Sequence, residues 1–319
     1  MISTKHREKP YKYENMKPNM ESLIERLDEK FAAIDQKTEV HLEGLVHANP
    51  ITYWDYIMPD ALLSLQIQRT TLPDEMVFIM YHQINELLFK MILWEMNQVC
   101  EKQEPDADFF TEKLRRISRY FDMLSTSFDI MGEGMEVEQY NKFRNTLTPA
   151  SGFQSAQYRL IEFASTDTIN LIDYRFRATI DRNTPIEHAY EHLYWHAAGK
   201  DHATGKKNTL ITNFERKYKP LFLEKMEYYN VKNLYQKFKA LPESVRKNEK
   251  LIQAMRHYDY TVNVAWVMAH YNAAMKYIGG GEATGGSDWR KYMHPKYQRR
   301  IFFPSLWSEE ELKSWGENV

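Results

Sequence analysis

The chain has 319 residues, a formal net charge of −2 and 43% hydrophobic residues. A chain of this length and composition can bury a substantial core, so we expect a globular protein. The small net charge gives no general electrostatic reason to bind nucleic acid or a membrane, so any partner has to be recognised by a local site. The single cysteine, Cys100, excludes an intrachain disulfide framework and fits a reducing, cytoplasmic environment.

The N-terminal stretch is polar and basic, and it has no apolar segment that could serve as a secretion signal. We expect residues 1–18 to form an arm that is poorly ordered by itself or that orders against a neighbouring subunit. No later run approaches the ~20 apolar residues that a membrane-spanning helix needs. The sequence therefore predicts a soluble, unexported protein.

Helical periodicity dominates the rest of the chain. The segment DEMVFIMYHQINELLFKMILWEMNQVCE, residues 74–101, has no glycine or proline, and its two leading acidic residues favour the dipole of a helix that starts there. Further helices are predicted at about 20–36, 108–130, 136–147, 152–174, 186–198, 208–240 and 243–278. Since no alternating β pattern competes, we predict an all-α fold with one helical-bundle domain over 19–319, in which 176–240 is a candidate helical insertion.

The eleven histidines are a natural place to look for chemistry, because imidazole is a common ligand for haem and zinc. His188, His192 and His196 recur every four residues and would line one face of a helix. One straight helix rarely surrounds a tetrahedral ion with three ligands, and the HExxH pattern of zinc proteases is absent. We therefore favour a polar helix face, with a metal site as the alternative.

A further histidine, His82, lies in a mostly apolar helical segment, one turn after Phe78. A histidine in this setting is usually a core residue with a satisfied hydrogen bond. Together, however, the two side chains would form a flat apolar wall beside a single hydrogen-bonding group. That combination suits a planar heteroaromatic ligand.

His270 also lies on an apolar segment, one turn after Trp266 and before five glycines that surround Thr284. One or two glycines are enough to end a helix, so five indicate a loop whose backbone can approach a ligand closely and whose threonine hydroxyl can bind it. The TGG run lacks the lysine of a phosphate-binding loop, and GKDHATGKK misses that pattern too. We do not expect nucleotide binding.

Four segments together resemble the tryptophan 2,3-dioxygenase family of haem enzymes: TYWDYIMPDALLSLQ, DEMVFIMYHQINELLFK, FRNTLTPASGFQSAQYRLIE and WVMAHYNAAMKYIGGGEATGGS. The resemblance implies an all-α haem dioxygenase that cleaves the indole C2–C3 bond of L-tryptophan with O2 to give N-formylkynurenine, the first step of the kynurenine pathway. A haem mono-oxygenase of a tryptophan derivative is the alternative. The resemblance also implies haem b, active as Fe2+, and a homotetramer built as a dimer of dimers in which N-terminal segments complete a neighbour's pocket.

The same resemblance implies roles for individual residues. His270 matches the axial ligand of the haem iron, with Trp266 beside it, and His82 matches the distal histidine that meets the indole N–H as an orienting or catalytic group. The other matches contact substrate: Phe78 the indole ring, Arg144 the carboxylate, Thr284 the ammonium and carboxylate, and Tyr53, Tyr56 and Tyr140 the pocket wall. Leu88, where the family carries tryptophan, and DWRKY after TGGS depart from the family pattern outside these contacts.

Overall fold

The computed structural model describes residues 19–147, 154–200, 204–279, 290 and 293–317. These residues form helices and turns, with two isolated β-bridges and no strand among them. The predicted all-α fold is confirmed. The predicted N-terminal arm and Thr284 lie outside the described residues. No described helix combines the length and the apolar character needed to cross a membrane.

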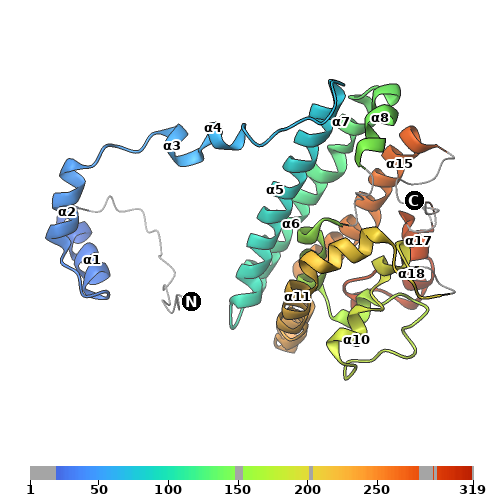
Figure 1. Cartoon of the computed structure of the whole chain (residues 1–319). Helices are drawn as coiled ribbons and strands as arrows, with labels where there is room; N and C mark the ends of the chain where they lie inside the picture. Colours follow the sequence, from blue (N-terminus) through green and yellow to red (C-terminus); the bar gives the residue numbers. More distant parts are fainter. Residues whose placement is uncertain (1–18, 148–153, 201–203, 280–289, 291–292, 318–319) are drawn as a thin grey trace. The chain divides into compact units, whose positions relative to one another are not determined.

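The chain divides into two compact units, Met1–Leu65 and Gln66–Val319. The described part of the first unit holds four short helices, which are α1 (Met20–Ala32), α2 (Thr38–His47), α3 (Tyr53–Ile57) and α4 (Pro59–Leu62) (Figure 1). Thr38 is the one buried residue among residues 19–65, so this segment has no hydrophobic core of its own. The domain bounds at 19–319 and the insertion at 176–240 stay predictions.

The second unit is a bundle of longer helices joined by short ones (Figure 1). The longer helices are α5 (Asp74–Glu101), α6 (Ala107–Thr126), α9 (Ala156–Ser165), α11 (Thr209–Asn230), α14 (Glu249–Tyr260) and α15 (Trp266–Ile278). The shorter ones are α7 (Phe128–Glu133), α8 (Val137–Phe143), η1 (Arg144–Leu147), η3 (Thr168–Leu171), α10 (Ile186–Tyr190), η4 (Tyr194–Ala198), α12 (Leu234–Ala240), α13 (Glu243–Arg246), α17 (Pro295–Gln298), η6 (Pro304–Leu306) and α18 (Glu309–Lys313). The longest predicted helix, 74–101, is confirmed with those bounds.

Two hydrophobic clusters hold the second unit together. The main core lies between α5, α6, α9, α11 and α14, where side chains such as Ile92 and Phe121 are fully buried. The second cluster lies where the first half of α5 meets α7, α8 and α15. Its buried members are Tyr81, Phe128, Met131, Met135, Phe143 and Tyr277. Three of the four segments that carry the family resemblance contribute residues to this second cluster, among them Phe78, Phe143 and Trp266.

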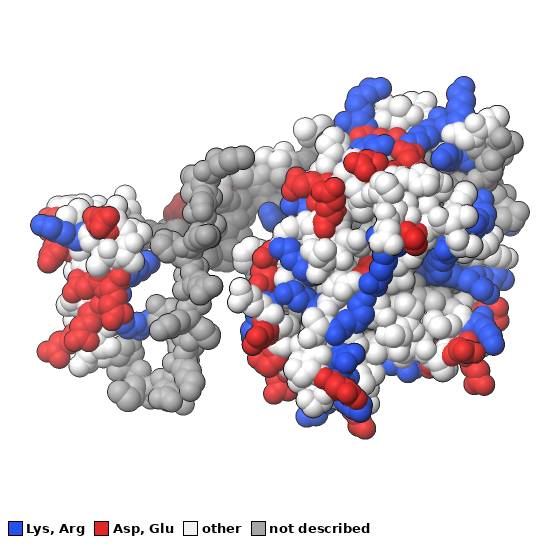
Figure 2. All heavy atoms as spheres, turned by 90° about the horizontal axis from the view of Figure 1, so that it is seen from below, with Lys and Arg blue, Asp and Glu red and all other residues white. Residues whose placement is uncertain are grey.

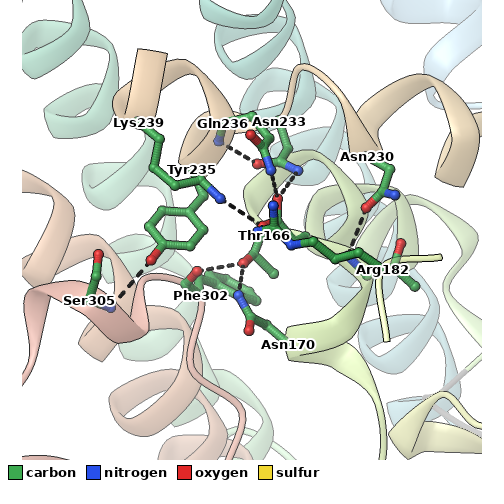
Figure 3. A network of polar contacts seen from close by, with 12 residues as sticks. Thr166, Asn170, Arg182, Asn230, Asn233, Tyr235, Gln236, Lys239, Phe302 and Ser305 are labelled. Atoms are coloured by element: carbon green, nitrogen blue, oxygen red, sulfur yellow. Dashed lines mark hydrogen bonds and ion pairs between the residues drawn. The ribbon is translucent and has the colours of Figure 1, made fainter. Parts of the chain in front are cut away.

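The segment before η6 crosses the main core without helical structure. Phe302 and Phe303 are fully buried, and the Phe302 carbonyl accepts a hydrogen bond from the Thr166 hydroxyl at 2.5 Å (Figure 3). Beside Thr166 in the chain, the buried carboxylate of Asp167 accepts hydrogen bonds from Asn233, Gln236, Lys239 and Arg182. This network joins the end of α9 to α12 and to the C-terminal segment.

The surface carries charges of both signs. On the face shown in Figure 2, acidic and basic side chains are interspersed over the second unit. This mixture agrees with the small net charge of the chain, and it gives that face no single-sign field that would steer a polyanion.

Candidate active site

The side of the candidate site that carries Phe78 and His82, which we call the distal side, lies on the first turns of α5. The rings of Phe78 and His82 lie one helical turn apart, with 4.1 Å between their centroids. His82 Nδ1 lies 2.7 Å from the Phe78 carbonyl oxygen, and because a carbonyl can only accept, we assign the proton to Nδ1. Removal of water from the ring lowers the pKa of His82, although the Phe78 carbonyl and Glu86 oppose that effect. Nε2, which carries no proton in this tautomer, can then accept a hydrogen bond.

His270, on α15, faces the same region. Phe128 stacks almost parallel to its ring, with the centroids 5.2 Å apart, and Trp266 lies 6.1 Å away. Within the described chain neither ring nitrogen of His270 has a hydrogen-bond partner. Burial, and then the nearby His82, lower its pKa to about 4. The structure thus brings together two imidazoles far apart in the sequence, and His270 keeps a free lone pair at neutral pH.

The short helices α8 and η1 place Arg144 near the distal side. The Phe78 ring contacts Phe143 and Tyr140, with centroid distances of 5.5 Å and 6.2 Å. The Arg144 guanidinium lies 5.8 Å from the centre of the Tyr140 ring, so a chain of ring contacts joins it to Phe78. Arg144 caps the end of α8, where a half-buried cation is favoured by the helix dipole.

Asp74, Gln139 and Arg69, to which the sequence analysis assigns no role in the site, hold this turn against the start of α5. The Asp74 carboxylate accepts from the Glu136 backbone N–H at 2.7 Å, and Gln139 accepts from the Asp74 N–H. Arg69 donates to the carbonyl of Thr146, within η1. These contacts join segments remote in the chain, so no local spacing reveals them. The position of Asp74 in the first turn of α5 is the one signal of such a contact, but a favourable interaction with the helix dipole explains an acidic residue there equally well.

The other predicted residues lie in the first unit or outside the described residues. Tyr53 and Tyr56 lie on α3 in the first unit, where both side chains are exposed. The capping box of Thr52 and Asp55 explains why this helix begins at Tyr53. Thr284 is outside the described residues. The site described in the second unit therefore comprises Phe78, His82, Tyr140, Arg144, Trp266 and His270.

The histidine triplet at 188–196 does not form a metal site. The helix predicted over 186–198 is wrong, because α10 ends at Tyr190 and Leu193 is extended and bridges to Ile172. His196 Nε2 instead lies 3.1 Å from Glu215, and His192 Nδ1 lies 2.9 Å from a backbone carbonyl. Across the described residues, no three His, Cys, Asp or Glu side chains gather in a way that could hold an ion.

The residues around His270 fit a haem. Haem iron needs only one axial protein ligand, and His270 has a ring nitrogen available for that role. Phe78, Phe128 and Trp266 provide flat apolar walls for a porphyrin or a planar substrate. The buried indole N–H of Trp266 also has no partner among the described residues, which leaves a donor for a bound group. A helical fold with such a site has the features expected of an all-α haem protein.

Comparison with known proteins gives the family. The family model described as tryptophan 2,3-dioxygenase matches residues 40–182. The chain is 30% identical over 299 residues to a tryptophan 2,3-dioxygenase of Bacillus thuringiensis (strain Al Hakam), a match that covers 86% of this chain and 98% of that protein. It is 27% identical over 274 residues to the enzyme of that name from Myxococcus xanthus (strain DK1622), with 82% and 89% covered. The chain belongs to the tryptophan 2,3-dioxygenase family.

Proposed function

We propose that this protein is a haem-dependent dioxygenase that cleaves the indole C2–C3 bond of L-tryptophan and yields N-formylkynurenine. The observation that carries the proposal is that Phe78, His82 and His270 lie together in a chain of this family. Both atoms of O2 enter the product, as the first step of the kynurenine pathway requires. Mono-oxygenation of a tryptophan derivative is not favoured, because the relatives are dioxygenases by name.

We assign the haem to His270. The imidazole would donate its lone pair to the iron, while Trp266 and Phe128 keep the ring in place. Haem b in the Fe2+ state supplies the binding and activation of O2 when it is bound. The low pKa of the histidine supports this role, because the ligand must be neutral to bind.

The substrate assignments follow from what free tryptophan offers. Its carboxylate needs a cation, its indole needs an apolar slot, and its ring N–H needs an acceptor. Arg144 would bind the carboxylate through its two-pronged guanidinium, which is worth roughly 1.5 to 3 kcal/mol per hydrogen bond to a charged group. Phe78 and Tyr140 would line the slot, and His82 Nε2 would accept from the indole. By resemblance, Thr284, Tyr53 and Tyr56 complete the pocket.

The role of His82 is orientation. Its Nδ1–H is engaged by the Phe78 carbonyl, so its Nε2 position is fixed before substrate arrives. A lowered pKa makes the imidazole a weaker base, which argues against removal of the indole proton. Holding the indole in a reactive position is a large contribution by itself.

One experiment tests the reaction. The full chain is loaded with haem and reduced without oxygen, then given O2 and L-tryptophan, and the product is weighed by mass spectrometry. Two added oxygen atoms are expected, whereas one added atom or no reaction would contradict the proposal. His270→Ala should lose the histidine-ligated spectrum and the turnover. His257→Ala, which changes an exposed histidine of α14, should keep both.

We also propose a cytoplasmic homotetramer assembled as a dimer of dimers. The coreless first unit supports it, because residues 19–65 bury almost nothing of their own. A second support is an apolar stripe on α5, which comprises Met80, Ile84, Leu87, Met91 and Trp94, all exposed. Their alternating spacing of four and three residues is that of helix seams that pack against another helix. The buried, free thiol of Cys100 fits a reducing compartment.

A further inference from the structure

The helical run that carries His270 contains one irregular turn. Between α14 and α15 lies the π-turn η5 (Thr261–Ala265), in which the Trp266 N–H bonds to the Thr261 carbonyl, five residues back. An α-helix would make this bond four residues back. The turn thus accommodates one residue more than an α-helical turn does, and it ends five residues before His270. Turns of this kind are frequent at functional sites.

The extra residue changes which side chains face inward. On α14 the buried face includes Leu251, Met255 and Tyr258. Five turns of 3.6 residues beyond Tyr258, an unbroken α-helix would present Lys276 in the same direction. In the structure Tyr277 is buried and Lys276 is exposed. The faces of α14 and α15 are therefore offset by one residue, and an unbroken helix would put Ala269 where His270 now points.

The π-turn is held open by buried polar side chains. Thr261, Val262, Asn263 and Val264 are all buried. The Asn263 amide donates to Asp259 at 2.7 Å, and the Asn263 oxygen accepts from Arg300 Nε. A buried amide bonded at both ends leaves little freedom for the turn to tighten, because tightening would leave a buried donor or acceptor unpaired.

Both partners of Asn263 are themselves fixed by other segments. Asp259 accepts from the backbone N–H groups of Phe302 and Phe303, at 2.9 Å each. Arg300 donates to Glu162 of α9 at 2.5 Å. The C-terminal segment therefore clamps the turn to the main core. The clamp is remote from the substrate contacts and bears on the site through the direction of α15.

We propose that the π-turn, clamped by Asp259, Asn263 and Arg300, sets the rotation of α15 that points His270 at the haem. Asn263 and Arg300 are positioning residues. The proposal rests on the proposed function, because it takes His270 as the axial ligand. It goes further by assigning the direction of His270 to the π-turn and to the side chains that hold this turn open.

Two single-residue deletions test the rotation. Deleting Asn263 removes the extra residue, so a regular α-helix would still aim His270 correctly. Deleting Met268, within α15, leaves the π-turn and rotates His270 by about 100° relative to α14. The chains are refolded with haem, their helicity is checked by circular dichroism, and the ferrous spectrum and haem dissociation constant are measured. We expect the Asn263 deletion to keep the histidine-ligated spectrum and the Met268 deletion to lose it. Equal loss or equal retention would overturn the proposal.

Point substitutions keep the test decisive if a deletion fails to fold. Asn263→Ala is compared with Asn233→Ala, because Asn233 is equally buried and also donates to a buried aspartate, Asp167 (Figure 3). We expect haem to bind at least tenfold more weakly to Asn263→Ala and less than twofold more weakly to Asn233→Ala. Equal effects on both would refute the positioning role.

The wild-type chain and His270→Ala separate the two levels of the proposal. If the wild type binds no haem, or if His270→Ala keeps the wild-type spectrum, the proposed function fails. If those two behave as expected and Asn263→Ala matches Asn233→Ala, only the positioning role of the π-turn fails. The spectrum and the dissociation constant are read without turnover, so a loss of activity from another cause does not enter the result.

Discussion

At the scale of single residues, the hydrogen bond from His82 to the Phe78 carbonyl leaves Nε2 as the ring nitrogen that can accept from the indole in the proposed binding mode. We predict that His82→Ala lowers kcat/KM for L-tryptophan by about tenfold to 100-fold, because an orienting contact is lost and placement suffers. Haem binding should persist, since His270 is untouched. Steady-state kinetics and the Soret spectrum check this. Unchanged kinetics would show that His82 has no role in the reaction. Abolished turnover with intact haem binding would indicate that His82 acts as an obligatory base.

Arg144 permits a sharper test through the substrate. Arg144→Lys keeps the charge but loses the planar fork, so we predict a fall in kcat/KM of roughly 10- to 150-fold, equivalent to about 1.5 to 3 kcal/mol. Tryptamine, which lacks the carboxylate, should be used equally by both enzymes. Arg116→Lys, on the exposed side of α6, is the matched control. The same loss with both substrates would contradict the carboxylate role.

The sequence predicted these residues through two different kinds of signal. Periodicity places Phe78 and His82 on one helix face, but their roles came from the family resemblance. The sequence does not predict the contact between Asn263 and Arg300, because these residues lie far apart in the chain. Asn263 is a polar residue in a mostly apolar helical segment, but nothing in the neighbouring sequence distinguishes a π-turn from an α-helical turn.

At the scale of elements, the end of α10 at Tyr190 explains why His188, His192 and His196 do not share one helix face, although their spacing predicts it. The spacing of four is helical, but the chain turns at Glu191, which pairs with Lys207 and Lys219. Burial of Glu191 acts to raise its pKa, and the hydrogen bonds from the two lysines outweigh it and lower the pKa to about 2. A tertiary ion pair thus stabilises a break that local pattern could not foresee.

This ion pair predicts how stability depends on pH. Because the folded pKa of about 2 lies below the ordinary value of 4.5, the carboxylate stabilises the fold above pH 4.5 and loses that effect as the pH falls toward 2. Glu191→Gln should therefore lower Tm at pH 6 and lose less Tm than the wild type between pH 5 and 3. Thermal melts across this range measure it. Glu138→Gln, at a fully exposed pair, is the control and should change Tm little. Parallel wild-type and Glu191→Gln curves would contradict the assignment.

At the scale of the whole molecule, composition and periodicity were enough for the all-α class, because helices form from local spacing. They could not divide the chain at Leu65, since that boundary depends on which segments bury surface together. The first unit has helical sequence without a core, which is unusual for a segment that folds by itself. Many of its apolar side chains are exposed, which supports the assembly of several copies that we propose.

The apolar stripe on α5 makes that assembly testable. We predict that the wild type has the mass of a tetramer by light scattering, and that Leu87→Glu with Trp94→Glu shifts it to smaller species, because two charges buried between helices lose their hydration. Met123→Glu introduces a charge at an equally exposed apolar residue of α6 and should leave the tetramer intact. A wild type of about one chain mass would refute the tetramer. A tetramer that survives the α5 substitutions would instead place its contacts on another face, and equal dissociation by the α6 substitution would show a general effect of added charge.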